Sequence, residues 1–404
     1  MIFTPARMPH DQTRSPAPPT ADRRAYPFID AIRGVASLVI LAHHLVSYVP
    51  GADATLAAVP VIHHIVWWYG GLATQVFLVI SGFVGGVSLA RATPEAADLG
   101  RLLLVRYLRL ALPAVATLLF AIGLYAIVPP SWAAFSLFDE ISAPGVLAHV
   151  AFLQDVLGYP SLLAGFWYLS IDWQCNAVMC LLIIVQDAIL RRLPGLSRST
   201  LSRSTLSRST LSRFAQGLAV IGLPMVVAIP SLFLWNGAVA HETYATYFFG
   251  IVFLGTLAGL AVAGRIQPVI FWAYVAAVAI AAGAAVMQSR PHLAVAVVAG
   301  VTIYLLARRQ PSAASRADSL PLLGWLGRIS YALFLVHYPT IWAVTSVARG
   351  IGGDAATASW PSLVAAVAAS LVAAVLLHRL VEVPTLALVG RLKPRQTGAV
   401  SPSR

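Results

Sequence analysis

The sequence predicts an all-α polytopic membrane protein, and the prediction rests on composition, hydropathy and charge placement. Hydrophobic residues make up 59% of the chain and charged residues only 10%, whereas soluble domains carry about 25% charged residues. Mean hydropathy is +0.80. Apolar stretches long enough to cross about 30 Å of hydrocarbon recur along the chain, so we expect a bundle of about ten transmembrane helices.

The predicted spans divide the chain into one membrane domain and two tails. Residues 1–26 are polar and rich in proline, which predicts a disordered cytoplasmic tail. The membrane domain follows over residues 27–388, and residues 389–404 form a second cytoplasmic tail. The expected spans, of which the eighth is short, are residues 28–49, 66–90, 103–128, 165–190, 215–236, 244–263, 268–287, 293–308, 326–348 and 361–382.

Charge placement sets the predicted orientation. The net charge is +12, but the arginines gather in the segments predicted to lie inside, and the outside loops hold only Arg290 and Arg349. This is the positive-inside pattern, and it predicts that both termini are cytoplasmic. The basic balance is therefore a topology signal; we expect the lipid bilayer, and no nucleic acid, as a partner. Lys393 is the only lysine beside many Ala and Arg residues, which is typical of a GC-rich bacterial genome and suggests the bacterial cytoplasmic (inner) membrane.

Two minor features carry little chemistry. Cys175 and Cys180 both lie in the fourth span, five residues apart, so they do not share a helical face. Because no Cys/His spacing typical of metal sites occurs, we expect no metal. Residues 197–213 repeat the pentapeptide SRSTL, which predicts a flexible basic linker. The alternative is a phosphorylatable or lipid-binding loop.

The first span contains the most informative pattern, because ionisable residues interrupt an apolar segment. Asp30, Arg33 and His44 fall, with Ser37, on one stripe of the helix. A charge inside a spanning helix costs a few kcal/mol and marks a functional site by default. Arg33 and His44 are about 16 Å apart along the axis. The stripe should therefore run from a guanidinium near one surface to an imidazole near mid-depth.

Further polar residues occur in the other spans, and several have a structural alternative. Ser81 and Gly82 lie in span two, where small residues allow close helix packing. Arg106 and Arg109 share a face at the start of span three. They are either topology anchors that reach the headgroups or a clamp for phosphate, which the planar guanidinium binds bidentately.

Spans four, nine and ten each carry a polar group near one end. Asp172 lies one turn from Tyr168 and Asn176, and is either half of a structural ion pair or a substrate contact. In span nine, Ser330 and His337 share a face. At the end of span ten, Glu382 lies within reach of His378 and Arg379, as a helix-terminal ion pair or part of a site.

Six separated motifs, in order, resemble the acyltransferase 3 family of integral-membrane O-acyltransferases over roughly residues 26–388. The motifs are DAIRGVA at 30–36 followed by His44, FLVISGF at 77–83, RYLR at 106–109, WYLSIDWQ at 167–174, ISY at 329–331 followed by Leu335 and His337, and EVP at 382–384. Where the family usually has Glu in the fourth motif this chain has Asp172, so a contact there requires a closer approach.

The resemblance implies transfer of an acyl group, usually acetyl from acetyl-CoA, to a hydroxyl of a sugar, a surface glycan or a glycosylated metabolite. Acyl-CoA would be a co-substrate, with no permanently bound cofactor. The family's Arg-x10-His pattern maps onto Arg33 and His44, and its Arg-x-x-Arg pattern onto Arg106 and Arg109. We expect Arg33, Arg106 and Arg109 to hold the phosphates of acyl-CoA.

The chemistry of acyl transfer suggests a role for each remaining candidate. His44 is expected as the general base, or alternatively as a covalent acyl carrier, while Asp30 orients Arg33. Hydroxyl groups are candidates for hydrogen bonding to the oxyanion. The oxyanion candidates are Ser81, Ser170 and Tyr331, and the further substrate-contact candidates are Trp167, Asp172, His337 and Glu382.

Two other classes of function stay open on the sequence. A secondary transporter or flippase with proton-coupling Arg and His residues would show paired repeats with discontinuous helices, and the two halves show no internal similarity. A non-catalytic scaffold or receptor would leave the polar stripe of the first span unexplained.

Overall fold

A computed structural model describes residues 26–93, 95–138, 141–192, 210–237, 241–288, 290–309 and 321–392, and every regular element in these ranges is helical. The predicted all-α class is therefore confirmed. Residues 1–25 and 393–404, which are most of the two predicted tails, and most of the SRSTL repeat lie outside the described residues.

The long elements are helices of membrane-spanning length, connected by short helices and turns. The first half contains α1 Pro27–Tyr48, α2 Ala52–Leu56, α3 Pro60–Tyr69, η1 Gly70–Leu72, α4 Ala73–Leu89, α5 Ala96–Ile127, η2 Pro130–Trp132, α6 Ala143–Val150 and α7 Phe166–Arg192. The second half contains α9 Thr210–Pro230, η4 Ser231–Trp235, α10 Ala245–Val262, α11 Pro268–Val286, α12 His292–Arg308, α13 Pro321–Gly352, α14 Asp354–Thr357, α15 Trp360–Leu377, η8 His378–Glu382 and α16 Val383–Gly390.

Nine helical stretches of the described chain are long and apolar enough to cross a membrane. They match nine of the ten predicted spans. The remaining one, α12, is a shorter apolar helix of 17 residues, in agreement with the short eighth span of the prediction. The chain is thus a multi-pass membrane protein.

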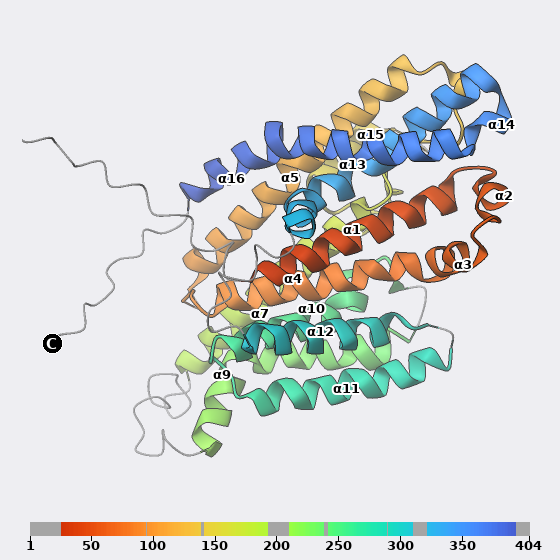
Figure 1. Ribbon diagram of the computed structural model, residues 1–404. Coiled ribbons are helices and arrows are strands. Elements are labelled where there is room, and N and C mark those ends of the chain that lie inside the picture. Colours follow the sequence, from red (N-terminus) through yellow and green to blue (C-terminus); the bar gives the residue numbers. More distant parts are fainter. Residues whose placement is uncertain are drawn as a thin grey trace, which may run out of the picture.

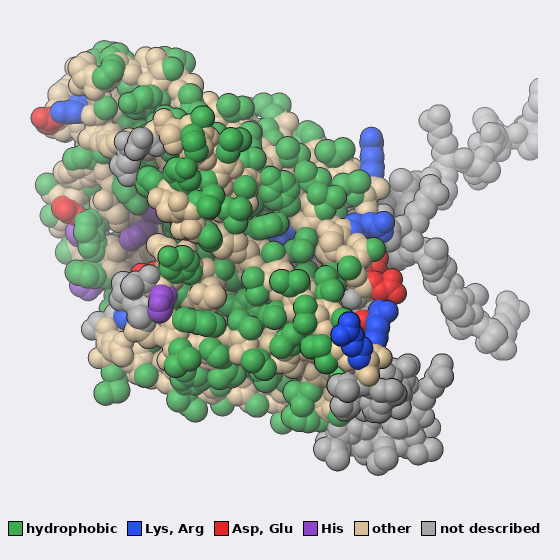
Figure 2. Space-filling view, turned by 180° about the vertical axis from the view of Figure 1, so that it is seen from behind, with side chains coloured by type: hydrophobic (Ala, Val, Ile, Leu, Met, Phe, Trp, Pro, Cys, Tyr) green, Lys and Arg blue, Asp and Glu red, His purple; other side chains and the backbone are tan. Residues whose placement is uncertain are grey.

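The long helices run side by side along a common direction, with α1, α5, α13 and α15 on one side and α9, α11 and α12 on the other (Figure 1). Figure 2 shows a broad hydrophobic surface in the middle, with Arg side chains gathered at one end, where some acidic side chains also show. Following the positive-inside rule, we call this end the inner end. His and acidic side chains show at the opposite, outer end (Figure 2).

Helices α4 and α10 make the closest packing contact of the bundle. Each carries two glycines four residues apart, Gly82 and Gly86 on α4 and Gly255 and Gly259 on α10. A Cβ atom on any of them would collide with the backbone of the facing helix. Such small-xxx-small pairs let two membrane helices approach until their backbones touch. The prediction that the glycines of span two serve packing is consistent with this contact.

Helices α1 and α13 pack in the same way near their inner ends. A Cβ atom on Gly34 would lie 2.9 Å from the backbone nitrogen of Gly327, and one on Gly327 would collide with the backbone of Asp30. Both helices then run outward in parallel. The crossing at the two glycines therefore fixes which residues of α1 and α13 face each other further along.

The segment between α5 and α7 folds back deep into the bundle. The Tyr107 hydroxyl donates to the carbonyl oxygen of Val150 at 2.9 Å, and the Gln174 side chain donates to the carbonyl of Phe152 at 2.7 Å. Tyr107 precedes the outer end of α5, at Ile127, by about 30 Å of helix. Irregular backbone at this depth is tolerated where it is buried in protein or lines a cavity.

Candidate active site

Two histidines from separate helices meet in the outer half of the bundle. His44 Nδ1 lies 2.6 Å from His337 Nε2, and the two rings are stacked with centroids 4.8 Å apart. Both residues follow the glycine contact between α1 and α13 by ten positions, His44 after Gly34 and His337 after Gly327. Because parallel helices rise equally per residue, equal spacing from the crossing brings the two imidazoles to the same level.

The hydrogen bonds of the pair assign the ring protons. His337 Nδ1 lies 2.9 Å from the carbonyl oxygen of Leu333, and a carbonyl oxygen only accepts, so this nitrogen carries the proton. In neutral His337, Nε2 is then an acceptor, and His44 Nδ1 donates to it. The lone pair of neutral His44 consequently lies on Nε2, which makes that atom the base or nucleophile of the pair.

His44 lies near the outer end of its helix. It precedes Tyr48, the last residue of α1, by about 6 Å of helix. Its position near mid-depth in the membrane stays a prediction. Tyr48 and Tyr338 flank its ring, with centroids 5.2 and 6.2 Å away. Its ring centroid also lies 5.6 Å from that of His43.

A second polar centre lies towards the inner end. The Arg106 guanidinium reaches both carboxylate oxygens of Asp172 at 2.8 Å, and Ser81 donates to the same carboxylate while accepting from Arg106. Asp172 is 2% exposed. Of the two interpretations left open for Asp172, the structure shows the ion pair. Removing one partner of such a buried pair leaves an uncompensated charge.

Aromatic side chains fill the space between the two centres. Tyr168 lies one turn before Asp172 on α7, which places it beside the inner centre. Its ring contacts that of Phe334 at 5.3 Å, and Phe334 lies 6.2 Å from the ring of His337. A continuous row of side chains thus connects the arginines to the histidine pair.

The other predicted site residues make separate contacts of their own. Tyr331 donates to the carbonyl of Leu110 at 2.8 Å, and Glu382 binds His378 Nδ1 at 2.8 Å. Ser170 is fully buried, and its hydroxyl lies beside the carboxyl group of Asp155. None of these three is among the contacts of His44. Further members of the predicted set lie on the inner half of α1, on α5 and on the first turn of α7, namely Asp30, Arg33, Arg109 and Trp167.

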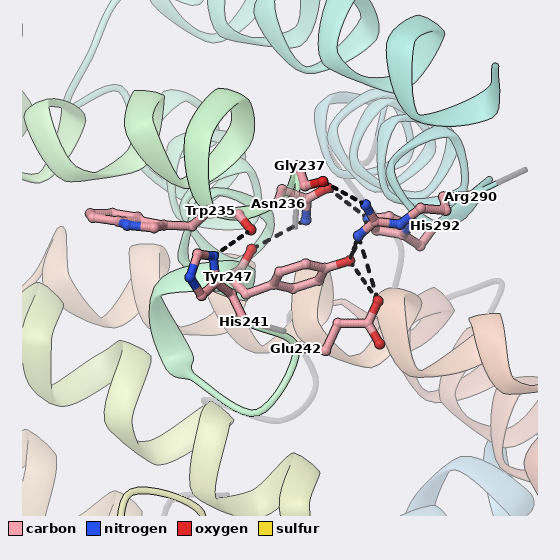
Figure 3. Close-up of polar contacts among 8 residues, drawn as sticks. All are labelled: Trp235, Asn236, Gly237, His241, Glu242, Tyr247, Arg290 and His292. Carbon is pink, nitrogen blue, oxygen red and sulfur yellow. Dashed lines mark hydrogen bonds and ion pairs between the residues drawn. The ribbon is translucent and has the colours of Figure 1, made fainter. Parts of the chain in front are cut away.

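The structure also contains a polar cluster at the outer end that the sequence did not predict (Figure 3). The Tyr247 hydroxyl accepts from Arg290 and donates to Glu242 at 3.0 Å. His292 Nε2 lies 2.8 Å from Asn236 Oδ1. These contacts join η4, α10 and α12, so we call the five residues the outer clamp. Arg290 is an arginine in a loop predicted to lie outside, and this exception to the positive-inside pattern was the feature of the sequence that could have indicated the outer clamp.

Two ionisable residues lie in the folded-back segment. Burial raises the pKa of Asp155 to about 6, because a charged carboxylate loses hydration there. Burial likewise lowers the pKa of His149, whose Nδ1 bonds the carbonyl of Gly145 at 2.7 Å and whose Nε2 accepts from the backbone of Leu162. His149 therefore fastens the segment as a neutral residue.

The fold and the two centres define a multi-pass membrane protein with a paired-histidine site inside the bundle. Comparison with known families shows that the chain belongs to the acyltransferase 3 family: residues 26–379 match its acyltransferase domain. The protein is accordingly an acyltransferase, in agreement with the resemblance of its six motifs. Neither a search of curated proteins nor a search of solved structures returned a match to the chain.

Proposed function

We propose that this protein transfers an acyl group, in the first instance acetyl, from acyl-CoA to a hydroxyl of a sugar, a surface glycan or a glycosylated metabolite. The observation that carries the proposal is the His44–His337 pair, which leaves a lone pair on His44 Nε2. A histidine with a free lone pair and a fixed partner on its other nitrogen suits general-base catalysis.

In the proposed reaction His44 Nε2 takes the proton of the acceptor hydroxyl. The hydroxyl oxygen attacks the thioester carbonyl, the C–S bond breaks, and the proton passes to the departing CoA thiolate. His337 accepts a hydrogen bond from His44 Nδ1 throughout, so it holds the imidazole in the reactive tautomer. An acyl group carried on His44 Nε2 is the alternative, and it uses the same lone pair.

The arginines are proposed to receive the donor from the cytoplasmic side. Arg33, Arg106 and Arg109 all lie in the inner halves of their helices. Arg106 is engaged by Asp172, so in our proposal it stabilises the site and, with Arg33 and Arg109, attracts the phosphates of the donor. The distance of about 16 Å along α1 from Arg33 to His44 is then spanned by the flexible arm of CoA.

A comparison of three strains tests the proposal. Ester-linked acyl groups on envelope glycans and secreted glycosylated metabolites are measured by mass spectrometry in wild type, in a deletion strain, and in the deletion strain expressing His44→Ala at matched membrane levels. We expect one species to lose an acetyl-sized mass in the second and third strains. If His44→Ala restores that mass, His44 is structural and the mechanism is wrong.

A further inference from the structure

Three aromatic rings cover His44 on its outer side. Tyr48 and Tyr338 flank the imidazole, and their own centroids are 4.9 Å apart. Phe135, from the connection after α5, closes the group at 6.3 Å from Tyr48 and 5.8 Å from Tyr338. We call these three residues the aromatic collar.

Phe135 is held over the site by hydrogen bonds between an irregular segment and α13. Trp342 Nε1 donates to the carbonyl of Phe135 at 2.9 Å, and the preceding backbone N–H, of Ala134, donates to Ser346 at 3.0 Å. Arg349 donates to the carbonyl of Ala133. Because α13 also carries His337 and Tyr338, one helix positions the histidine partner and two of the three rings of the collar.

The collar combines a buried ring with an accessible one. Tyr338 is 6% exposed, whereas Tyr48 is 41% exposed, and Phe135 and His44 lie between these extremes. An exposed ring beside a half-buried base is the arrangement expected of an entrance, since ligand sites are lined mainly by aromatic side chains with a few polar groups.

Acyl transfer requires an acceptor to be admitted while water is excluded. Water and a sugar hydroxyl attack a thioester in the same way: the oxygen bonds the acyl carbon, the C–S bond breaks, and the proton ends on the CoA thiol. Water yields the free acid instead of the ester. A closed apolar wall around the reacting group suppresses this side reaction.

Building on the proposed function, we propose that Tyr48, Phe135 and Tyr338 form the acceptor subsite, in which the face of a sugar ring packs on the aromatic rings and its hydroxyl meets His44 Nε2. In the absence of acceptor the same rings shield the acyl thioester from water. Phe135 is the residue that sets the ratio of transfer to hydrolysis, because it belongs to neither of the two helices that carry the histidines.

Hydrolysis tests the collar without knowledge of the acceptor. The full chain in lipid nanodiscs is incubated with acetyl-CoA alone, and release of the CoA thiol is measured. We expect Phe135→Ala to raise release at least about fivefold, because water gains access to the thioester, and His44→Ala to abolish the increase in the double variant. Tyr48→Ala should also raise release.

Phe138→Ala is the matched control. Phe138 lies in the same segment, is 7% exposed, and packs on Tyr125 at 5.4 Å instead of on the collar. The Phe138→Ala variant should release the CoA thiol at the wild-type rate. Size-exclusion profiles should show that all variants are folded. If Phe135→Ala releases the CoA thiol at the wild-type rate, the proposed role of the collar is wrong. The same conclusion follows if Phe138→Ala raises release as much as Phe135→Ala does. If His44→Ala leaves both CoA release and ester formation unchanged, the proposed function itself fails, which is a distinct result.

Discussion

Gly34 of α1 and Gly327 of α13 touch backbone to backbone, and a Cβ atom on Gly34 would lie only 2.9 Å from the nitrogen of Gly327. His44 and His337 stand ten residues further along the same two helices. The glycine contact therefore fixes how α1 and α13 are aligned along their axes, and this alignment brings the two imidazoles to the same level.

We predict that Gly327→Ala destabilises the protein and lowers activity, because its Cβ would collide with the backbone of Asp30. The matched variant is Gly324→Ala on the same helix, where the nearest atom is the end of the Arg328 side chain at 3.7 Å. Alanine favours a helix over glycine by about 1 kcal/mol, so this control should be neutral or stabilising. Melting temperatures in detergent measure both; equal melting temperatures would remove the register argument.

Replacing His337 should lower kcat with little change in KM for acyl-CoA, because the residue positions His44 and does not touch the donor. His337→Ala removes the acceptor of the His44 Nδ1 proton, and a loss of about 10²–10⁴-fold is the usual size of a general-base contribution. His337→Gln offers a carbonyl oxygen in its place and should recover part of the rate. The measurement is a kinetic titration with acyl-CoA. A large rise in KM with kcat intact would instead assign His337 to donor binding.

The Arg106–Asp172 pair should be far more sensitive to single than to paired substitution. Asp172→Asn leaves the buried Arg106 charge uncompensated, which typically costs about 3–5 kcal/mol. The double variant Arg106→Met with Asp172→Leu removes both charges and should regain much of the folded yield. Unfolding midpoints of the two single variants, the double variant and wild type form the cycle. Additive losses across it would show that the two residues do not act as a pair.

Asp155 should make stability depend on pH in the mildly acidic range. Burial raises the pKa of Asp155 from 3.8 to about 6 in the folded protein, so the folded state holds the proton more tightly than the unfolded state. The stabilisation is complete below pH 3.8 and is lost as the pH rises to about 6. His149, in the same segment, has its pKa lowered by burial.

The Asp155→Asn variant isolates that contribution. Its melting temperature should exceed that of wild type at pH 7.5, where the buried carboxylate is charged, and the difference should shrink towards pH 4. A constant difference between the two proteins across this range would assign the effect to packing and not to the carboxyl proton.

The outer clamp should contribute to the stability of the α10–α12 side without taking part in catalysis. Tyr247→Phe removes a hydroxyl that Arg290 and Glu242 share, and the loss of a hydrogen bond to charged groups costs about 1.5–3 kcal/mol. Tyr244→Phe, at a position 44% exposed, is the control and should have little effect. We expect a lower melting temperature with unchanged kcat at a temperature where both variants are folded. A lower kcat in folded Tyr247→Phe would connect the clamp to the reaction.

Hydropathy and motif order were sufficient to predict the helical class, the spans and the family, because each depends on residues close together in the sequence. The same holds for His378 and Glu382, which are one turn apart and do pair. The stripe of Asp30, Arg33 and His44 followed from helix geometry alone. Roles for Arg33, Arg109 and the oxyanion candidates stay predictions, since they depend on a bound donor.

Contacts between segments far apart in the sequence could not be predicted in this way. Nothing in the sequence indicated that His337 would meet His44, a partner 293 positions earlier, or that Phe135 would cover both Tyr48 and Tyr338. Asp172 was left between an ion pair and a substrate contact until the packing of α5 against α7 brought Arg106 to it.

The sequence by itself determined that this is a multi-pass membrane acyltransferase with ionisable residues inside its first helix, since burial in lipid restricts both composition and the placement of charge. Only the tertiary structure decided which of those residues act together. Backbone contacts such as that of Gly34 with Gly327 set the register between helices, and register, which no local pattern encodes, decides whether two side chains are neighbours.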